Sequence, residues 1–253
     1  MMLVFYLNLR TYKQVVLLTL CLFAIAGLFT FAVLRQPAAS PTNAENKNSP
    51  IIYRVRTDKK AVALTFDISW GTKTPGPVLD ILKGNDVRCT FFLSGPWVRK
   101  YPEVAKRIAA EGHEIASHGY RHINLSQLSK EAVKSEILQA HQIIASVTGK
   151  KPRYIRTPNG DWDAKVLKAA QEVGYTVIQW EVDSLDWKNP GVDTIIRRVT
   201  TLVRPGSIVL LHASDSCQQT DEALPVIIRE LQEQGYELVT LSELLRYGPG
   251  VVE

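Results

Sequence analysis

Short apolar segments of strand type alternate with amphipathic segments of helix type through most of this chain. The apolar segments are rich in β-branched and aromatic residues, and the amphipathic ones repeat their apolar residues near a 3.6-residue period. Because strands separated by helices pair in parallel, we expect an α/β fold, with the strands in a closed or nearly closed (β/α) barrel. The expected strands are Ala61–Phe66, Arg88–Leu93, His113–Ser117, Thr176–Trp180, Ser207–Leu211 and Tyr236–Leu241, and the expected helices are Glu103–Glu111, Lys130–Thr148, Ala164–Val173, Val192–Val203 and Thr220–Gln234, with Ser129 and Asp161 as N-cap residues of the second and third.

An uncharged apolar segment, Val15–Leu34, precedes this region and is flanked by Arg10, Lys13 and Arg35. It is long enough to cross a bilayer core of about 30 Å as a helix. A cleaved signal peptide usually has a shorter core, of about 7–15 residues, so cleavage near residues 37–40 is the weaker alternative. The two basic residues of the tail favour a cytoplasmic N-terminus. We therefore expect a cytoplasmic tail at 1–14 and a transmembrane signal anchor at 15–34, with the rest of the chain outside the cytoplasm.

The sequence from 35 to 57 is expected to be a linker and lead-in, because its first part is polar and rich in proline. A domain at 58–247 and a tail at 248–253 follow. The net charge of +5 includes no basic patch interleaved with aromatic residues, which argues against a nucleic-acid partner. Cys89 and Cys217 could form a disulfide in an oxidising compartment, but we expect both to be unpaired and Cys89 to be buried. The oligomeric state is not indicated.

Five short motifs lie at or just after the ends of expected strands, where α/β barrels place their catalytic groups. Together they provide two imidazoles spaced for a metal, several carboxylates and a further imidazole. This combination is the equipment of metal-assisted hydrolysis. The motifs are T-F-D at 65–67, H-x-x-x-H at 118–122, R-x-P-x-G at 156–160, D-x-x-D-W at 183–187 and L-L-H at 210–212.

His118 and His122 are the candidate metal ligands. Their spacing would place both imidazoles on one face of a helix, as many metal sites require. A solvated surface pair is the plainer interpretation, and the position at a strand end favours the metal. His113 and His141 are expected to be structural.

Asp67 is the candidate general base, and a loop anchor or helix cap is its structural alternative. His212 is the candidate acid, because Asp186 could pair with it and raise its pKa; packing at the strand end is the alternative. Arg156 has a guanidinium suited to orienting the carboxylate of Asp67.

The remaining candidates would contact the substrate. The turn through Asn159 and Gly160 could present a backbone N–H to a developing oxyanion. Trp187 and Leu210 could form an apolar pocket of the size of a methyl group, a role compatible with core packing.

The five motifs, in this order, resemble those of the polysaccharide deacetylases, the NodB homology domain of carbohydrate esterase family four, from Lys60 to Leu245. The leader, the linker and T-F-D-I-S-W-G are most similar to the sporulation-associated PdaB-like branch. The resemblance implies a distorted (β/α) barrel that removes N-acetyl groups from amino sugars of a peptidoglycan-like wall glycan. It also implies a divalent metal, with zinc expected, on His118 and His122, with Asp67 as base, Arg156 positioning it, Asp186 tuning the acid His212, and Trp187 and Leu210 lining the acetyl pocket.

The sequence departs from this family at Ile68, where the first motif usually has a second aspartate that is the third metal ligand. Asp161, Asp183 or Ser69 could compensate. Asn159 stands where the family often has an aromatic residue. The alternative function is therefore a glycan-binding or wall-assembly factor with weak or lost catalysis. A third is a hydrolase of another C–N or ester bond on the same barrel.

Overall fold

The structure is a computed structural model that describes residues 51–252. The predicted membrane segment at 15–34 lies outside these residues. Within the described range, no helix combines the length and the apolar character that crossing a bilayer requires.

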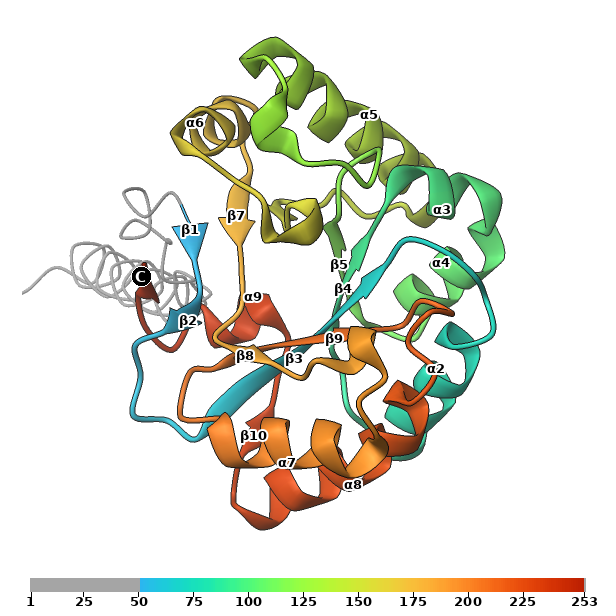
Figure 1. The fold of residues 1–253 in the computed structure, drawn as a ribbon, viewed down its shortest axis with the longest axis vertical. Coiled ribbons are helices and arrows are strands. Elements are labelled where there is room, and N and C mark those ends of the chain that lie inside the picture. The colour runs from blue at the N-terminus through green and yellow to red at the C-terminus, as the bar shows by residue number, and fades with distance from the viewer. Residues whose placement is uncertain (1–50, 253) are drawn as a thin grey trace, which may run out of the picture. The chain divides into compact units, whose positions relative to one another are not determined.

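Parallel strands form the centre of the fold, as the alternating sequence predicts (Figure 1). In the main sheet the strand order is β1-β7-β6-β5-β4-β3-β9-β8, and β10 also pairs with β3. A separate antiparallel pair joins β2 to β11. The strands are β1 Ile51–Ile52, β2 Arg54–Val55, β3 Ala61–Ile68, β4 Thr90–Leu93, β5 Glu114–Ser117, β6 Tyr154–Ile155, β7 Thr176–Ile178, β8 Val182–Asp183, β9 Ile208–His212, β10 Glu237–Leu238 and β11 Gly250–Val251.

One segment of chain connects the two sides of this sheet. β7 pairs with β6 and β1, whereas β8, only a few residues later, pairs with β9 at the other edge. Between them, the amide of Gln179 donates to the carbonyl of Ile52, and the amide of Glu181 donates to the carbonyl of Ile208. The bend between β7 and β8 therefore brings the sheet round on itself and gives a distorted barrel.

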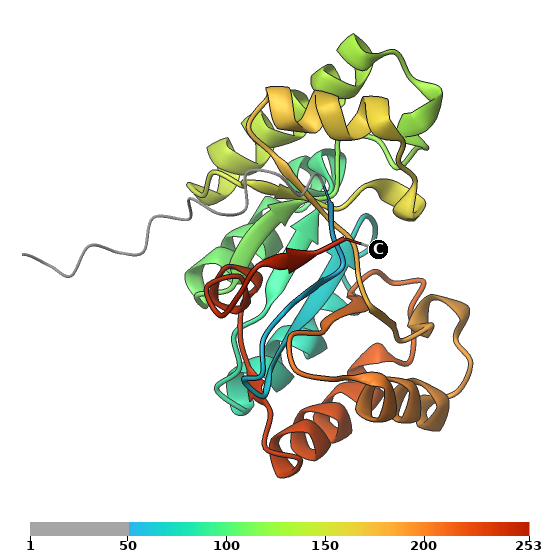
Figure 2. The ribbon, with the colours of Figure 1, turned by 90° about the vertical axis from the view of Figure 1, so that its left-hand side faces the viewer.

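Helices surround the strands on the outside (Figure 1). In the perpendicular view, α5 and α6 lie together beyond one end of the strand layer, and α7 and α8 lie together beyond the other (Figure 2). Alternate residues of β3 (Val62, Leu64, Phe66 and Ile68) belong to the largest buried apolar cluster, which also contains residues of α2, α4, α5, α7 and α8. The helices are α2 Pro75–Gly84, α3 Gly95–Lys100, α4 Pro102–Ala110, α5 Lys130–Thr148, α6 Ala164–Glu172, α7 Val192–Leu202, α8 Thr220–Glu233 and α9 Leu241–Leu244, with short 3₁₀ turns at Leu125–Gln127, Pro158–Gly160 and Asp186–Lys188.

The inside of the barrel is filled at the amino ends of the strands. Ala61 and Ala63 of β3 belong to a second buried cluster with Phe92 of β4 and Leu241 and Leu244 of α9. Small residues on β3 leave room for these larger side chains. The opposite end of the barrel, at the carboxyl ends of the strands, remains available for a site.

Several element boundaries differ from the prediction. The expected strand at 176–180 ends at Ile178 as β7, and β8 is a further short strand beyond it, at Val182–Asp183. The expected strand at 236–241 ends early because Thr240 forms a capping box with Glu243 and starts α9. Asp163, and not Asp161, caps α6 by accepting from the amide of Val166. β1 of the main sheet lies in the lead-in at 35–57, and the separate pair joins β2 of the lead-in to β11 of the tail at 248–253.

His113 and His141 each form a hydrogen bond within the fold, and Cys89 and Cys217 are unpaired, as predicted. His113 accepts a hydrogen bond from the amide of Cys89 at 3.2 Å, and His141 bonds to the hydroxyl of Tyr175 at 2.7 Å. Cys89 and Cys217 are both buried, and neither forms a disulfide.

Candidate active site

Asp67 and His212 lie side by side at the carboxyl ends of neighbouring strands. In the parallel pairing of β3 with β9, these two residues are register partners. Asp67 is 4% exposed, whereas the side chain of His212 keeps about a fifth of its surface open to solvent. A candidate base and a candidate acid therefore share one edge of the barrel, although they are far apart in the chain.

Arg156, directly after β6, holds the Asp67 carboxylate. Its Nη1 donates to Asp67 Oδ1 at 2.8 Å, and its Nη2 donates to the carbonyl of Gln179 at 3.1 Å. The guanidinium also lies 4.2 Å from the centre of the Phe92 ring and is fully buried. Burial alone would favour the neutral carboxyl, but the positive charge of Arg156, supported by the imidazole of His118, lowers the pKa of Asp67 below its ordinary value. Asp67 is therefore ionised at neutral pH and oriented, as a base must be.

His118 follows β5 and His122 lies on the loop beyond it. The prediction of a helical pair was wrong, because the chain around Gly119, at φ +77°, is a loop and brings the two rings together without a helix. Their ring centres are 5.3 Å apart. His118 is buried, whereas His122 lies at the exposed rim.

The tautomer of His118 is set by its surroundings. Its Nδ1 lies 2.8 Å from the carbonyl oxygen of Arg156, which can only accept, so Nδ1 carries the hydrogen and Nε2 keeps a free lone pair. Nε2 in turn lies 3.7 Å from Asp67 Oδ2. Burial lowers the pKa of His118 to about 4, and the imidazole is neutral near pH 7. A buried neutral imidazole with a backbone partner on Nδ1 is the arrangement of a metal ligand.

Asp186 lies beneath His212 and binds it twice. Asp186 Oδ1 is 2.7 Å from His212 Nδ1, and Oδ2 accepts from the His212 amide at 2.7 Å and from the Thr220 hydroxyl at 2.8 Å. Burial would favour the neutral imidazole, but the Asp186 carboxylate raises the pKa of His212 above its ordinary value. His212 thus retains a proton to higher pH than a free histidine, which suits a proton donor.

A cavity of about 450 Å³ opens between these groups and unites most of the predicted residues. Arg156 and Asp186 are fully buried behind it and act on it through Asp67 and His212. The amide of Gly160 donates to the Thr157 carbonyl within the turn, so the expected oxyanion contact depends on Asn159. The lining consists of Asp67, Ser69, Trp70, His118, His122, Thr157, Asn159, Gly160, Trp180, Asp183, Trp187, Leu210, His212, Ser214, Ser216 and Cys217.

The donors at His118 and His122 fit a divalent metal, but the family's third ligand has no direct substitute. Ile68 is fully buried in the cluster between the sheet and the helices. Asp161 is occupied elsewhere, since both of its oxygens bind Ser126, and Asp183 lines the cavity while accepting from an amide two residues later. Ser69 also lines the cavity, and its buried hydroxyl oxygen has no hydrogen-bond partner among the described residues. Of the three proposed substitutes, Asp161 is thus committed elsewhere, whereas Ser69 and Asp183 both line the cavity.

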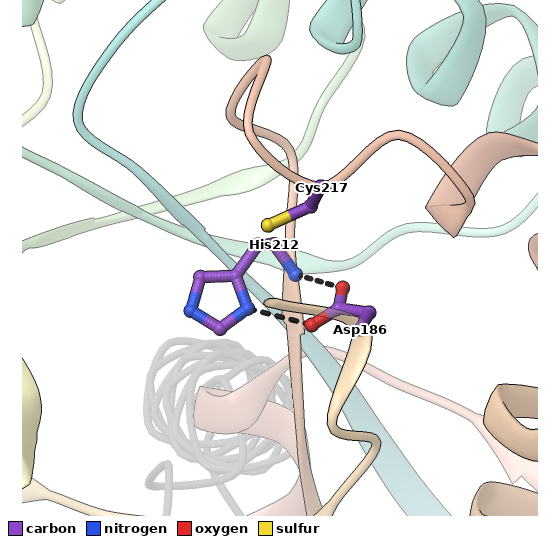
Figure 3. A group of neighbouring side chains, drawn as sticks. All are labelled: Asp186, His212 and Cys217. Carbon is purple, nitrogen blue, oxygen red and sulfur yellow. Dashed lines mark hydrogen bonds and ion pairs between the residues drawn. The ribbon is translucent and has the colours of Figure 1, made fainter. Parts of the chain in front are cut away.

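A second group of donors, not predicted as ligands, also makes a possible metal site. Ligand atoms of Asp186, His212 and Cys217 all lie within 4.8 Å of one another (Figure 3). Cys217 is 1% exposed and lines the same cavity. Sequence reasoning missed it, although a cysteine five residues after L-L-H was a visible signal.

Two loops, at 69–74 and 214–217, contribute residues to the cavity lining and are here called the rim loops. The carboxylate of Asp215 accepts from the amides of Thr72, Lys73 and Thr74 at 2.7–3.1 Å. The indole of Trp70 donates to Ser216 Oγ at 3.0 Å and meets the His122 ring edge-on, with 5.1 Å between the ring centres. These bonds hold a 45% exposed tryptophan beside the histidine pair, which no spacing in the sequence indicated.

Similarity to known proteins identifies the family of this chain. The profile of the polysaccharide deacetylase family matches residues 54–178. A peptidoglycan-N-acetylglucosamine deacetylase of Bacillus cereus is 37% identical over 191 residues, which cover 75% of this chain and 70% of that protein. The chain belongs to the polysaccharide deacetylase family. Its distorted barrel is the fold that the resemblance implied.

Two further relatives of this family bear on function. The uncharacterised protein YlxY of Bacillus subtilis is 33% identical over 77% of this chain, and the match spans 60% of YlxY. A CE4 family pseudoenzyme of Bacillus anthracis is 38% identical, with a TM-score of 0.74 over 78% of this chain and 69% of that one. A mutant of that pseudoenzyme has restored enzymatic activity. The polysaccharide deacetylase family thus includes both enzymes and a pseudoenzyme at similar distances from this chain.

Proposed function

We propose that this protein hydrolyses N-acetyl groups of amino sugars in a peptidoglycan-like glycan and releases acetate. The observation that carries the proposal is the register pairing of Asp67 with His212. Arg156 lowers the pKa of Asp67, as a base requires, and Asp186 raises the pKa of His212, as an acid requires. The name of the Bacillus cereus relative supports the substrate class. A divalent ion, zinc by preference, would be held by His118 and His122, where it would polarise the amide carbonyl and acidify water.

Asp67 begins the reaction as a general base. Its carboxylate, fixed by Arg156, takes a proton from the attacking water, and the oxygen adds to the carbonyl carbon of the acetamide. The negative charge that develops on the carbonyl oxygen can be met by the Asn159 turn at the cavity rim. Trp187 and Leu210 line the cavity and offer apolar contact to the acetyl methyl group.

His212 completes the reaction as a general acid. It donates its proton to the leaving nitrogen as the carbon–nitrogen bond breaks, and the products are acetate and a free amine. Asp186 holds the imidazole through Nδ1, so the proton on Nε2 is the one available to the substrate. The buried carboxylate also stabilises the imidazolium before transfer.

The proposal includes a membrane location. The apolar segment at 15–34 would anchor the chain with its N-terminus in the cytoplasm and the barrel outside, near the wall glycan. The similarity of T-F-D-I-S-W-G to the PdaB-like branch supports a role in sporulation. Deletion of 1–34 should release the protein from membranes while leaving acetate release measurable.

A glycan-binding or wall-assembly role is the second candidate, and Ile68 is the observation that favours it. Two imidazoles make a weaker zinc site than the three protein ligands of most catalytic zinc sites. The similarity to a pseudoenzyme supports the same alternative. Against it, a binder has no evident need for the Asp67–Arg156 and His212–Asp186 pairs.

Acetate release decides between these functions. The full-length protein would be incubated with N-acetylated peptidoglycan fragments, with and without zinc or cobalt. We expect metal-dependent release in the wild type and loss of release, by at least about 100-fold, in Asp67→Asn and His212→Ala. Lys106→Met, which alters an exposed ion pair with Glu103, is the control and should retain activity. A wild type that binds the fragments but releases no acetate with any metal would establish the binding role.

A further inference from the structure

The donor group Asp186, His212 and Cys217 has the composition of a site for a thiophilic metal. It combines a carboxylate, an imidazole and a thiol, the ligand types that zinc accepts in proteins. The carboxylate and the thiol are both buried, and Figure 3 shows the sulfur directed toward His212. Their ligand atoms all lie within 4.8 Å of one another, so small adjustments of the side chains would bring all three onto one ion.

Hydrogen bonds occupy Asp186 more fully than Cys217. Asp186 has bonds to the ring and the amide of His212 and to Thr220. Among residues 51–252, the one hydrogen-bond contact of the Cys217 sulfur is with the neighbouring Ser216 hydroxyl, at 3.6 Å. It lines the catalytic cavity, and soluble ions can therefore reach it.

We propose that Asp186, His212 and Cys217 form a second metal site, which binds zinc or a similar soft divalent ion and inhibits the enzyme. This site is distinct from the pair His118 and His122. It uses Nδ1 of His212, the nitrogen that bonds to Asp186, so binding of the ion displaces the proton from Nδ1.

Occupancy has a definite proton balance. The thiol of Cys217 loses its proton to solvent and binds as the thiolate. A neutral His212 moves its proton from Nδ1 to Nε2, so one proton is released for each ion bound; the imidazolium form releases two. With Nδ1 on the metal, His212 can no longer become the imidazolium that donates to the leaving nitrogen. The inhibitory part of the inference therefore rests on the proposed function, whereas the binding part does not.

Apo Cys217 is well protected from competing reactions. Burial, reinforced by the charge of Asp186, raises the pKa of the Cys217 thiol to about 12. The thiolate that reacts with oxidants is therefore scarce without a metal.

Because hard ions such as magnesium prefer oxygen ligands, the site should discriminate against them.

Cobalt provides a direct readout of the sulfur ligand, independent of activity. The full-length protein would be titrated with Co²⁺ alone, and absorption from thiolate-to-cobalt charge transfer would be followed in the near ultraviolet. We expect the band in the wild type, in Cys89→Ser and in the double variant His118→Ala/His122→Ala, which lacks the other site. Cys217→Ser and Cys217→Ala should lose it, with circular dichroism confirming that they fold. A wild type without the band, or a band that persists in both Cys217 variants, would overturn the proposal.

A second experiment, on acetate release, tests whether zinc at this site inhibits the enzyme. Acetate release should rise and then fall by about tenfold or more as zinc increases, and Cys217→Ser should lose the falling phase while Cys89→Ser retains it. A falling phase that survives in Cys217→Ser would overturn the inhibitory role. If no variant or wild type releases acetate at any zinc concentration, the proposed function fails, and the cobalt band alone decides whether the metal site exists.

Discussion

The buried pair of Arg156 and Asp67 gives a prediction that does not depend on activity. Arg156 is fully buried and Asp67 nearly so, with 2.8 Å between Nη1 and Oδ1. Removing one member of a buried ion pair leaves the other charge uncompensated, which typically costs about 3–5 kcal/mol. Because Asp67 retains contact with His118 and the cavity, we expect Arg156→Met to lower the free energy of unfolding by about 3 kcal/mol, near the lower end of that range.

Asp67→Asn should cost a similar amount, since it leaves the guanidinium of Arg156 buried without a counter-charge. In the double variant neither charge is left alone, so its loss should be smaller than the two single losses together by about 2 kcal/mol. Urea denaturation of the full-length protein, followed by tryptophan fluorescence, measures all four states. Lys106→Met at an exposed pair is the matched control and should change the free energy by less than about 0.5 kcal/mol.

The same pair predicts a pH dependence. The pKa of Asp67 is lower in the folded than in the unfolded chain, so its stabilising contribution is present above the ordinary value near 3.9 and is lost as pH falls through the folded value. The difference in stability between wild type and Arg156→Met should therefore narrow in acid. Two results together would refute the argument that these two charges stabilise each other. The stability losses of the single variants would be strictly additive in the double variant, and the stability difference between wild type and Arg156→Met would stay constant down to about pH 3.

Three further changes test the acid, the rim loops and the mouth of the cavity. Asp186→Asn removes the charge that raises the pKa of His212, so NMR titration should find a lower value and the basic limb of kcat/KM should move to lower pH; an unchanged titration would contradict this pairing. Gly71 has φ +79°, and Gly71→Ala would place a methyl carbon 2.0 Å from Cγ of Asp215, whose carboxylate connects the rim loops. The change should lower the free energy of unfolding by about 2 kcal/mol in thermal denaturation, and an unaltered melting temperature would mean that the loops rearrange without cost. Trp70→Ala should raise KM for glycan fragments about tenfold with little change in kcat, while Trp162→Ala, outside the cavity lining, should leave both unchanged; equal effects would exclude a specific contact.

The sequence was most informative about the strands that carry chemistry. The apolar segments before Asp67 and His212 predicted the two strands that carry these residues. The position of the site was also predictable, because the carboxyl ends of the parallel strands in a (β/α) barrel all lie at the same end. The motifs also predicted two pairs of interacting side chains. The structure confirms both contacts, between Arg156 and Asp67 and between Asp186 and His212. The catalytic roles remain predictions.

Features that depend on tertiary structure were less predictable. The two-residue strand β6 is too short to produce a periodic pattern, and the bend that divides β7 from β8 serves barrel closure, which is a long-range constraint. The loop around His118 was mistaken for a helix because the i, i+4 spacing also fits a chain turned by a glycine. Cys217 and Trp70 were missed because their importance comes from neighbours that are distant in sequence.

The pairing of β3 with β9 has a consequence for how the site comes into being. β3 is near the start of the barrel and β9 is near its end, and the base and the acid are adjacent only through that pairing. Long-range strand pairing is slow because a large loop must close first. An emerging chain can complete α2 to α6 and still be chemically inert until β9 is inserted between β3 and β8. Proteolytic loss of the last third would likewise remove the reaction entirely rather than weaken it, so integrity of the barrel is itself a condition for catalysis.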